Sequence, residues 1–303
     1  MDLKSKIILI SGPTASGKSK FALKLAKKIN GEIINADSMQ IYKECKILSA
    51  RPSKKDQTEI KHHLYGFQSV KKNFSTGQWI NLCLKKIQEI KKKNKVPIVV
   101  GGTGLYFKSL VCGIAKIPSI PLSFRNNIIK TQKKIGQKNF YNKLIKLDPL
   151  CKNYIDINDQ NRSIRAYEVY IQTNKSLYTW FKDTKIHYQN KDFEKIFIDI
   201  PRDEVVKNLS NRIDKMIKAG AFQEVKRFNK LKVKNTNSSS KIIGIREINE
   251  LKPDKTNLSL IKEKITIKTR QYAKRQMTWA RGHMKDWQKI APNNLNSYLK
   301  KIS

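Results

Sequence analysis

The stretch Ile7-Ile8-Leu9-Ile10-Ser11-Gly12-Pro13-Thr14-Ala15-Ser16-Gly17-Lys18-Ser19 decides how the first part of this chain folds. Its apolar start predicts a short buried strand, and the remainder matches the phosphate-binding pattern G-x-x-x-x-G-K-[ST]. An amphipathic helical pattern follows, with Phe21, Leu25 and Ile29 spaced among lysines. Strand, loop and helix in this order are the context that a P-loop requires, so a chance glycine-rich turn is the minor alternative.

The residue types of this loop predict a site for a diphosphate. Gly12 and Gly17 let the backbone curl so that successive N–H groups point inward, and the start of the following helix adds partial positive charge. Lys18 supplies a full charge, and the Ser19 hydroxyl can hold a Mg²⁺ that bridges phosphate oxygens. We therefore expect a diphosphate- or nucleotide-binding site made by Gly12, Pro13, Thr14, Ala15, Ser16, Gly17, Lys18 and Ser19. The loop does not identify the molecule that carries the diphosphate.

The composition favours a polyanionic partner. The chain has 303 residues and a formal net charge of +39. Such an excess suits a nucleic acid or an anionic membrane, and it can also reflect the general composition of the source's proteins. No apolar run approaches the ~20 residues that span a bilayer, and no signal segment opens the chain. We expect a cytoplasmic, monomeric protein with no membrane partner.

The cysteines and histidines do not form a metal site. Cys45, Cys83, Cys112 and Cys151 are far apart in the sequence and contain no C-x-x-C pair, which argues against a zinc ribbon and against a disulfide scaffold. The four histidines also lack ligand spacing. Mg²⁺ is therefore the only metal that the sequence predicts.

The first third of the chain alternates strands with helices. Residues 6–10, 32–35 and 96–100 are short, continuous and β-branched, as in buried parallel strands, and residues 78–92 between the last two have helical spacing. Residues 195–200 predict one more strand of the same sheet. This alternation of strands and helices predicts an α/β fold with a P-loop parallel-sheet core.

A helical block interrupts this core. Prolines open it, and helical patterns follow at residues 125–134, 140–147 and 162–173. After the strand that ends near residue 200, amphipathic helices are predicted at 204–219, 222–231 and 258–280. We therefore predict a core of residues 1–118 and 194–303, ending in C-terminal helices, with a helical insertion domain at 119–193.

Two polar residues follow other strands of the predicted sheet. Asp37 comes two residues after the second strand, and Thr103 follows the strand that ends in Gly101-Gly102. Ligands of parallel α/β sheets bind at the carboxyl ends of the strands, so both are expected beside the P-loop. A carboxylate there could bind the Mg²⁺ shell or act as a base. The structural alternatives are a turn or helix-capping role for Asp37 and a plain glycine turn before Thr103.

The acidic anchor of a typical P-loop nucleotidase is missing from the expected strand. Such enzymes place an aspartate at the end of an apolar strand to hold the metal through water. Residues 96–100 end in Gly-Gly instead, and the only candidate is Asp199 after the insertion. The diphosphate therefore need not belong to ATP.

Several segments together resemble the tRNA dimethylallyltransferase family of the bacterial type, and the match covers nearly the whole chain. In chain order they are residues 12–19, Asp37-Ser38-Met39-Gln40-Ile41-Tyr42, Lys61-His62-His63-Leu64, Gly101-Gly102-Thr103-Gly104-Leu105-Tyr106, Asn161-Arg162-Ser163-Ile164-Arg165-Ala166-Tyr167-Glu168, Arg212-Ile213-Asp214-Lys215-Met216 with Gly220, Ile243-Gly244-Ile245-Arg246-Glu247, and Thr269-Arg270-Gln271-Tyr272-Ala273-Lys274-Arg275-Gln276. The P-loop alone is unspecific, whereas this conjunction in order and spacing is very specific.

The resemblance implies transfer of a dimethylallyl group from dimethylallyl diphosphate to the exocyclic N6 amine of the adenosine just 3′ of the anticodon in tRNA. By this analogy Asp37 pairs with the amine and accepts its proton. Thr103 contacts the leaving oxygen, and Arg125 contacts the same reaction centre. Lys18, the loop amides and Mg²⁺ on Ser19 stabilise the departing diphosphate.

The resemblance also implies which residues contact the tRNA anticodon stem-loop, whose bases must be splayed out to reach a pocket. The helix 258–280 combines cations with Tyr272 and Trp279, and the alternative for it is a solvated basic face. The expected contacts are Asp37, Ser38, Met39, Gln40, Thr103, Arg125, Gln160, Asn161, Arg162, Ser163, Ile164, Arg165, Lys241, Gly244, Arg246, Arg270, Lys274 and Arg275.

The chain departs from the family pattern at a few positions. Ile245 stands where an aromatic residue is usual, which puts a stacking role there in doubt, and Lys241 replaces a common Arg or Ala. No cysteine follows Cys151 in this sequence, so we expect no zinc finger of the kind found in eukaryotic members.

Two other function classes compete with this prediction. A P-loop kinase or ATPase acting on a small molecule or nucleoside would use the same loop and a helical lid. The missing acidic strand end and the basic C-terminal half disfavour it. A non-catalytic RNA-binding protein fits the charge but leaves the P-loop, Asp37 and Thr103 without a role.

Overall fold

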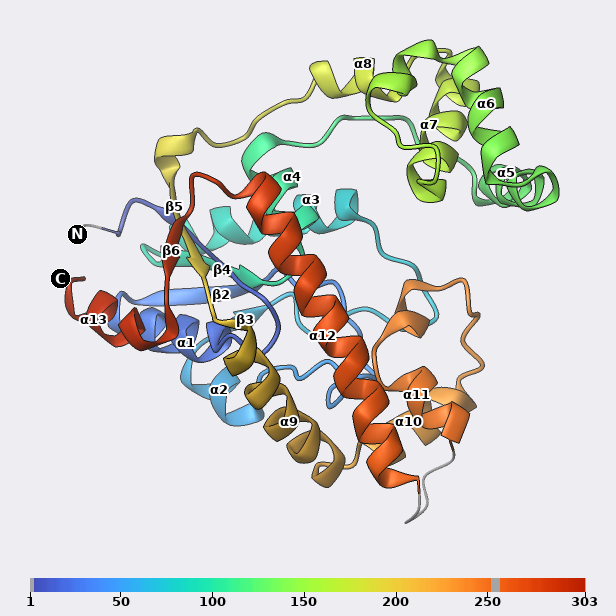
Figure 1. Cartoon of the computed structure of the whole chain (residues 1–303). Coiled ribbons are helices and arrows are strands. Elements are labelled where there is room, and N and C mark those ends of the chain that lie inside the picture. Colours follow the sequence, from blue (N-terminus) through green and yellow to red (C-terminus); the bar gives the residue numbers. More distant parts are fainter. Residues whose placement is uncertain (1–2, 252–256, 303) are drawn as a thin grey trace. The chain divides into compact units, whose positions relative to one another are not determined.

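The computed structural model describes residues 3–251 and 257–302 (Figure 1). The chain divides into two compact units. The core unit comprises Met1–Val111 and Tyr188–Ser303, and the insertion unit comprises Cys112–His187. Among the described residues, every helix is too short or too polar to cross a lipid bilayer.

The core unit is built on a parallel sheet in the order β3-β2-β4-β1-β5-β6. All the strand pairs in it are parallel. This confirms the predicted α/β fold with a parallel sheet. The strands are β1 (Ile7–Ser11), β2 (Gly31–Asn35), β3 (His62–His63), β4 (Val96–Gly101), β5 (Phe193–Ile198) and β6 (Gln288–Ile290).

The sequence missed the two edge strands, β3 and β6. They have two and three residues, which is too short for any hydrophobic period to be recognised. The predicted strand at 195–200 lies two residues earlier, because β5 ends at Ile198 where its pairing with Ile290 of β6 also ends.

Helices alternate with the strands of this sheet along the chain. α1 follows β1 directly, and the predicted helices at 78–92, 204–219, 222–231 and 258–280 are present as α3, α9, α10 and α12 with small shifts at their ends. The helices of this part are α1 (Lys18–Lys28), α2 (Lys54–Glu59), α3 (Thr76–Lys91), α4 (Gly104–Cys112), α9 (Arg202–Lys218), α10 (Ala221–Lys230), α11 (Ile245–Leu251), α12 (Leu258–His283) and α13 (Leu295–Lys300), with short 3-10 turns η2 (Asn190–Asp192), η3 (Ser238–Lys241) and η4 (Pro292–Asn294).

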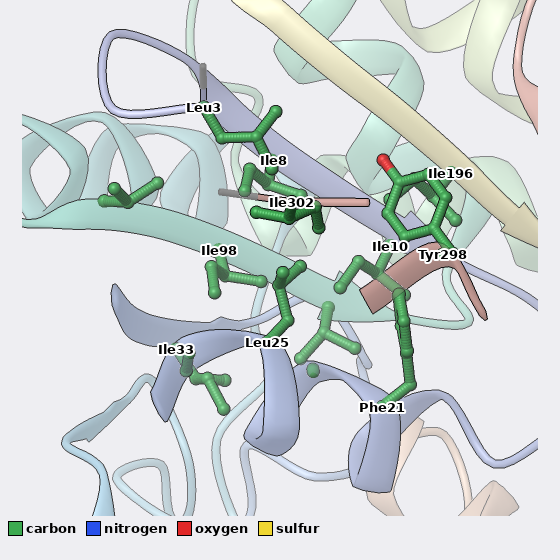
Figure 2. Close-up of a cluster of buried hydrophobic side chains, with 14 of the residues drawn as sticks. Leu3, Ile8, Ile10, Phe21, Leu25, Ile33, Ile98, Ile196, Tyr298 and Ile302 are labelled. Atoms are coloured by element: carbon green, nitrogen blue, oxygen red, sulfur yellow. The ribbon is translucent and has the colours of Figure 1, made fainter. Parts of the chain in front are cut away.

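The hydrophobic core beneath the P-loop joins both ends of the chain. Figure 2 shows Ile8 and Ile10 of β1 packed with Leu25 of α1 and with Tyr298 and Ile302 from the C-terminus. The rings of Phe21 and Tyr298 meet edge to face at a centroid distance of 6.0 Å. The residues that follow α12 therefore help to hold α1, and with it the P-loop, against the sheet.

A buried carboxylate fixes the long loop after β2. Glu224 of α10 is 2% exposed and accepts hydrogen bonds from the backbone N–H groups of Lys46, Ile47 and Leu48 at 2.8–3.1 Å. A charge buried this deeply is tolerated because several donors satisfy it. This contact anchors the loop that begins at Asp37 to the C-terminal helices.

The insertion unit is helical, as expected. Its elements are α5 (Leu122–Ile135), α6 (Gln137–Leu147), the 3-10 turn η1 (Pro149–Asn153), α7 (Gln160–Thr173) and α8 (Leu177–Lys182). Sequence reasoning set its limits at 119 and 193, whereas the compact unit runs from Cys112 to His187. The chain enters and leaves side by side, because a Cβ on Gly113 would lie 2.4 Å from the Lys185 carbonyl oxygen.

Candidate active site

The P-loop connects β1 to α1 and has the backbone that its glycines predict. Gly17 precedes α1 in the left-handed region at φ 83°, where a side chain is disfavoured. A Cβ on Gly12 would lie 2.9 Å from Ser16 Oγ and 3.1 Å from the Ile198 carbonyl oxygen. The Ser16 hydroxyl is buried and has no hydrogen-bond partner among the described residues. This orphaned donor is available to an anionic ligand in the loop.

Lys18 points back into the loop, and burial perturbs its charge. Its Nζ donates a hydrogen bond to the Pro13 carbonyl oxygen at 3.0 Å. Burial lowers the pKa of Lys18 to about 8, the carboxylate of Asp37 opposes this shift, and the guanidinium of Arg212 adds to it. A buried ammonium beside a second cation is an unfavourable arrangement that a bound anion would relieve.

Asp37 lies where the sheet topology predicts, but it also forms a turn. Its Oδ1 accepts a hydrogen bond from the Met39 N–H at 2.9 Å, and its own N–H donates to Asn35 Oδ1 at 2.8 Å. No helix follows it, so it is not a helix cap. Asp37 is therefore the side chain of an Asx-type turn and also the carboxylate that acts on Lys18 and Arg212.

Thr103 is tied to the Asp37 loop. Its Oγ1 accepts a hydrogen bond from the Ser38 N–H at 2.9 Å and lies 3.2 Å from Ser38 Oγ. Gly101, just before it, leaves no room for a side chain, because a Cβ would lie 2.1 Å from the backbone of Ala36. The missing acidic anchor thus has a steric cause: the end of β4 cannot carry an aspartate.

Asp199, the other candidate anchor, lies elsewhere. It follows β5, and its N–H donates to the Ile290 carbonyl oxygen at 3.0 Å. It lines a cavity of about 630 Å³ with Arg202, Arg270, Lys274 and Arg281, which we call the outer cavity. The residues that line the cavity at the P-loop do not include Asp199.

Two residues that sequence reasoning gave no role reach the P-loop from α9. Arg212 donates a hydrogen bond to Thr14 Oγ1 at 2.9 Å, and its charge interacts with that of Asp37. Burial lowers the pKa of Arg212, and the Asp37 carboxylate opposes this shift. Asn208, one turn earlier, donates to the carbonyl oxygen of Ala15, a non-glycine residue at φ 63°. Arg212 belongs to a segment of the family resemblance, which was the signal available in the sequence.

A third unassigned residue reaches the P-loop from α12. The Oε1 of Gln276 accepts from the Thr14 N–H at 2.9 Å, and its Nε2 donates to the Gly102 carbonyl oxygen at 2.9 Å. Gln276 therefore joins the loop after β1 to the loop after β4. Its motif was part of the family resemblance, but that motif alone did not indicate this bridge.

The P-loop cavity collects most of these groups. It measures about 410 Å³ and is lined by Lys18, Ser19, Asp37, Arg212 and Tyr272, among others. A neighbouring cavity of about 270 Å³ is lined by Ser38, Thr103, Gln276 and Trp279. Tyr272 and Arg275 line both cavities. The arrangement can hold a small anion at the P-loop and a second reactant on the Thr103 side.

The predicted cations of α12 do not share one face. Arg275 lines a cavity of about 830 Å³ with Lys241 and Arg246, which we call the side cavity. Arg270 and Lys274 line the outer cavity instead. The reason is helical geometry, since residues four apart share a face whereas positions 274 and 275 differ by about 100°. Their contact with tRNA stays a prediction, and the structure distributes the three cations over different cavities.

Other predicted contacts of the core unit lie around the same cavities. Met39 and Gln40 line the P-loop cavity, and Gln40 Nε2 also donates to the Ser49 carbonyl oxygen at 2.9 Å. Gly244 adopts φ 107° before α11. Ile245 is 5% exposed and packs in the core, so no stacking role remains for it.

The predicted tRNA residues of the insertion unit divide into exposed and buried ones. Gln160, Asn161 and Arg162 begin α7 and are exposed. Ser163 and Ile164 are buried, so their side chains do not face solvent, and their contact with tRNA stays a prediction. The helix turns them inward, where Ser163 Oγ donates to the Asp159 carbonyl oxygen at 2.7 Å.

Arg125 and Arg165 converge on one buried carboxylate. Glu168 is fully buried; its Oε1 lies 2.6 Å from Arg165 Nη1 and 3.5 Å from Arg125 Nη1. Its Oε2 is buried without a partner among the described residues. Sequence reasoning quoted Glu168 only as part of a motif. The role of Arg125 at the reaction centre stays a prediction, because Arg125 belongs to the insertion unit.

The described residues contain no cluster of three or more His, Cys, Asp and Glu side chains suited to a metal. A Mg²⁺ site made by protein ligands alone is therefore not present in that part of the chain. Ser19 and Asp37 nevertheless line the same cavity as Lys18. This set fits a Mg²⁺ held mainly by phosphate oxygens and water, which is the usual preference of this ion.

Comparisons with known proteins agree with this geometry. Residues 40–283 match the family model of the IPP transferases. A tRNA dimethylallyltransferase of Pelagibacter ubique (strain HTCC1062) is 56% identical over 302 residues, covering 100% of this chain and 96% of the relative. A tRNA dimethylallyltransferase of Rickettsia massiliae (strain Mtu5) is 42% identical over 284 residues, covering 93% of this chain and 78% of the relative.

Solved structures agree as well. A eukaryotic dimethylallyltransferase acting on tRNA superposes with a TM-score of 0.82 at 28% identity, covering 97% of this chain and 75% of that one. A tRNA delta(2)-isopentenylpyrophosphate transferase from Staphylococcus epidermidis gives a TM-score of 0.66 at 29% identity, covering 98% of this chain and 97% of that one. The resemblance that the motifs indicated is thereby confirmed. This chain belongs to the IPP transferase family and is one of its tRNA dimethylallyltransferases.

Proposed function

We propose that this chain, acting as a monomer, transfers the dimethylallyl group of dimethylallyl diphosphate to the exocyclic N6 amine of the adenosine 3′-adjacent to the anticodon in tRNA. The bond between the allylic carbon and the diphosphate oxygen breaks, and a bond from N6 to that carbon forms. The amine proton goes to Asp37, and diphosphate is released. The observation that carries this proposal is that Lys18, Arg212 and Asp37 line one cavity.

The cations of the cavity suit a leaving group that gains negative charge. Lys18 and Arg212 line the cavity proposed for the diphosphate, and Arg212 also donates a hydrogen bond to Thr14 Oγ1 of the loop. Groups that are fixed before the reaction stabilise developing charge without reorganisation. Ser19 would hold a Mg²⁺, and this ion would supply further positive charge to the diphosphate when bound.

The carboxylate of Asp37 suits the acceptor. An aromatic amine is a poor nucleophile because its lone pair is delocalised into the ring, and a carboxylate within hydrogen-bond reach of it is the simplest remedy. The turn contact with Met39 occupies Oδ1 and holds the side chain in place. Thr103, fixed by Ser38, would then contact the oxygen that leaves.

The kinase alternative is not favoured. The end of β4 has no space for an acidic anchor, and Asp199 lines the outer cavity rather than the P-loop cavity. A kinase needs this acidic group to hold its nucleotide-bound metal.

The test is a transfer assay with radiolabelled dimethylallyl diphosphate, Mg²⁺ and unmodified tRNA, followed by mass spectrometry of the tRNA nucleosides. We expect label in one adenosine of the anticodon loop. A thermal-shift comparison separates the alternatives, since dimethylallyl diphosphate with Mg²⁺ should stabilise the protein more than ATP does. Label only in a small molecule after incubation with γ-labelled ATP would instead establish a kinase.

A further inference from the structure

The insertion unit carries a group of exposed aromatic rings that the proposed reaction does not use. Tyr154 is 51% exposed and Phe181 is 49% exposed. The rings of Tyr154 and Tyr178 stack at a centroid distance of 4.1 Å and an interplanar angle of 18°. Phe181 meets Tyr178 edge to face at 5.6 Å. We call these three residues the aromatic ladder.

The ladder is anchored at its centre. Tyr178 packs against the buried cluster that contains Leu144, Cys151 and Leu177. The two outer rings are therefore held on a fixed support, although each keeps half of its surface open. Exposed apolar side chains that touch one another are less common on a protein surface than scattered ones, and they often mark an interaction site.

The insertion unit that carries the ladder is cationic as a whole, although carboxylates also lie near Tyr178. Burial raises the pKa of Tyr178, and the charges that act on its hydroxyl include those of Arg162, which lowers the pKa, and of Asp159 and Asp148, which raise it. The Arg162 side chain is 66% exposed, with Asp159 3.4 Å away. Residues 112–187 contain 14 Lys and Arg but only five Asp and Glu. An aromatic surface within this positive field suits an anionic aromatic polymer better than it suits a protein partner.

We propose that Tyr154 and Phe181, supported by Tyr178, form a stacking surface for an unpaired base of the bound tRNA, and that Arg162 pairs with an adjacent phosphate. This inference rests on the proposed function, because it takes tRNA as the partner. Stacking on tyrosine and phenylalanine accepts any base, since every base has a π-face. The ladder thus adds affinity for an unpaired nucleotide without reading its identity.

The test uses the full chain and an unmodified anticodon stem-loop RNA at fixed salt. We expect Tyr154→Ala and Phe181→Ala each to weaken RNA binding by about 5- to 150-fold, the range measured for one lost base–aromatic stack. Tyr154→Phe keeps the ring and should bind as the parent does. Ile186→Ala removes another exposed apolar side chain of the same unit, and it serves as the matched control.

The salt dependence separates stacking from charge. The alanine variants of the ladder should keep the parent's slope of log Kd against log salt concentration. Arg162→Ala should lower this slope by about one, because one phosphate contact is lost. Transfer at saturating tRNA should stay near the parent rate, so the loss appears in KM and not in kcat.

The stacking proposal would be wrong if both alanine variants bound RNA within twofold of the parent's affinity. It would also be wrong if Ile186→Ala lost as much RNA affinity as they do. In either case the parent protein would still modify tRNA. If the parent neither binds nor modifies tRNA, the proposed function and the ladder both fail.

Discussion

The Thr14 N–H donates a hydrogen bond to Gln276 Oε1 at 2.9 Å, although 262 positions separate the two residues. The side-chain amide of Gln276 also donates a hydrogen bond, from its Nε2 to the Gly102 carbonyl oxygen at 2.9 Å. One side chain of α12 therefore fixes the distance between the loop after β1 and the loop after β4. The loop after β1 carries the groups proposed for the leaving diphosphate, and the loop after β4 carries Thr103.

Replacing Gln276 should weaken binding of dimethylallyl diphosphate. Gln276→Ala removes two hydrogen bonds of about 1 kcal/mol each, about 2 kcal/mol together, so the Kd should rise by up to about 30-fold. Gln276→Glu should be worse, because the carboxylate cannot donate to Gly102 and brings negative charge near the diphosphate. Titration calorimetry measures both. Gln271→Ala, an exposed amide on the same helix, is the control and should bind normally. A stronger effect of the alanine than of the glutamate variant would contradict this account.

Arg212→Ala should reduce diphosphate binding more than tRNA binding. The guanidinium holds Thr14 and adds positive charge to the P-loop cavity, so its loss should raise the KM for dimethylallyl diphosphate by about 10²-fold. Steady-state kinetics with each substrate varied in turn provides the measurement. Asn211→Ala, an exposed neighbour, should leave both KM values unchanged. A rise confined to the KM for tRNA would remove Arg212 from the diphosphate site.

Binding of dimethylallyl diphosphate should weaken as the pH rises above 8. Burial lowers the pKa of Lys18 to about 8, so above this pH the free protein loses the ammonium charge. A bound diphosphate favours the charged form, and binding must therefore take up a proton there. The affinity should fall by up to about tenfold per pH unit above 8 and stay flat below it. Lys18→Arg keeps its charge at these pH values, and its affinity should be independent of pH. A parallel decline in both proteins would assign the effect to another group.

Asp37→Asn separates the proton-accepting role of Asp37 from its turn role. The amide oxygen can still accept the Met39 N–H, so the loop should keep its form. It cannot accept the amine proton, and kcat should fall by about 10²- to 10⁴-fold with little change in either KM. Single-turnover transfer of radiolabelled dimethylallyl groups gives the rate. Near-normal transfer by Asp37→Asn, or by Asp37→Ala, would show that this carboxylate is not the base.

Glu168→Gln should weaken tRNA binding without affecting dimethylallyl diphosphate. One oxygen of the buried Glu168 carboxylate attracts both Arg125 and Arg165. The neutral glutamine amide would lack this charge, so the two guanidinium groups would be attracted less strongly. The KM for tRNA should rise several-fold, to about tenfold, as two predicted tRNA contacts become less ordered. Thermal unfolding followed by circular dichroism checks that the unit still folds. Glu168→Asp should recover part of the loss, and an unchanged KM for tRNA would leave the carboxylate with a purely structural role.

Much of the core follows from local sequence patterns. β1, the P-loop and α1 form where the sequence predicts them, because a strand-sized apolar run, two glycines and an amphipathic helix act within one short segment. β2 and β4 also follow from their buried, β-branched runs. The strands β3 and β6 could not be predicted, since only pairing with their neighbours defines segments this short.

The candidate site divides in the same way. The sequence by itself determined the phosphate-binding loop and the family, and it placed Asp37 and Thr103 at the carboxyl ends of two predicted strands. Only the tertiary structure decided that Arg212 and Gln276 touch the P-loop, that Arg270 and Arg275 lie on different faces of α12, and that Ser163 is buried. The physical reason is that loop and strand patterns are local. Contacts between residues hundreds of positions apart depend instead on how the amphipathic helices α9 and α12 pack over the edge of the sheet.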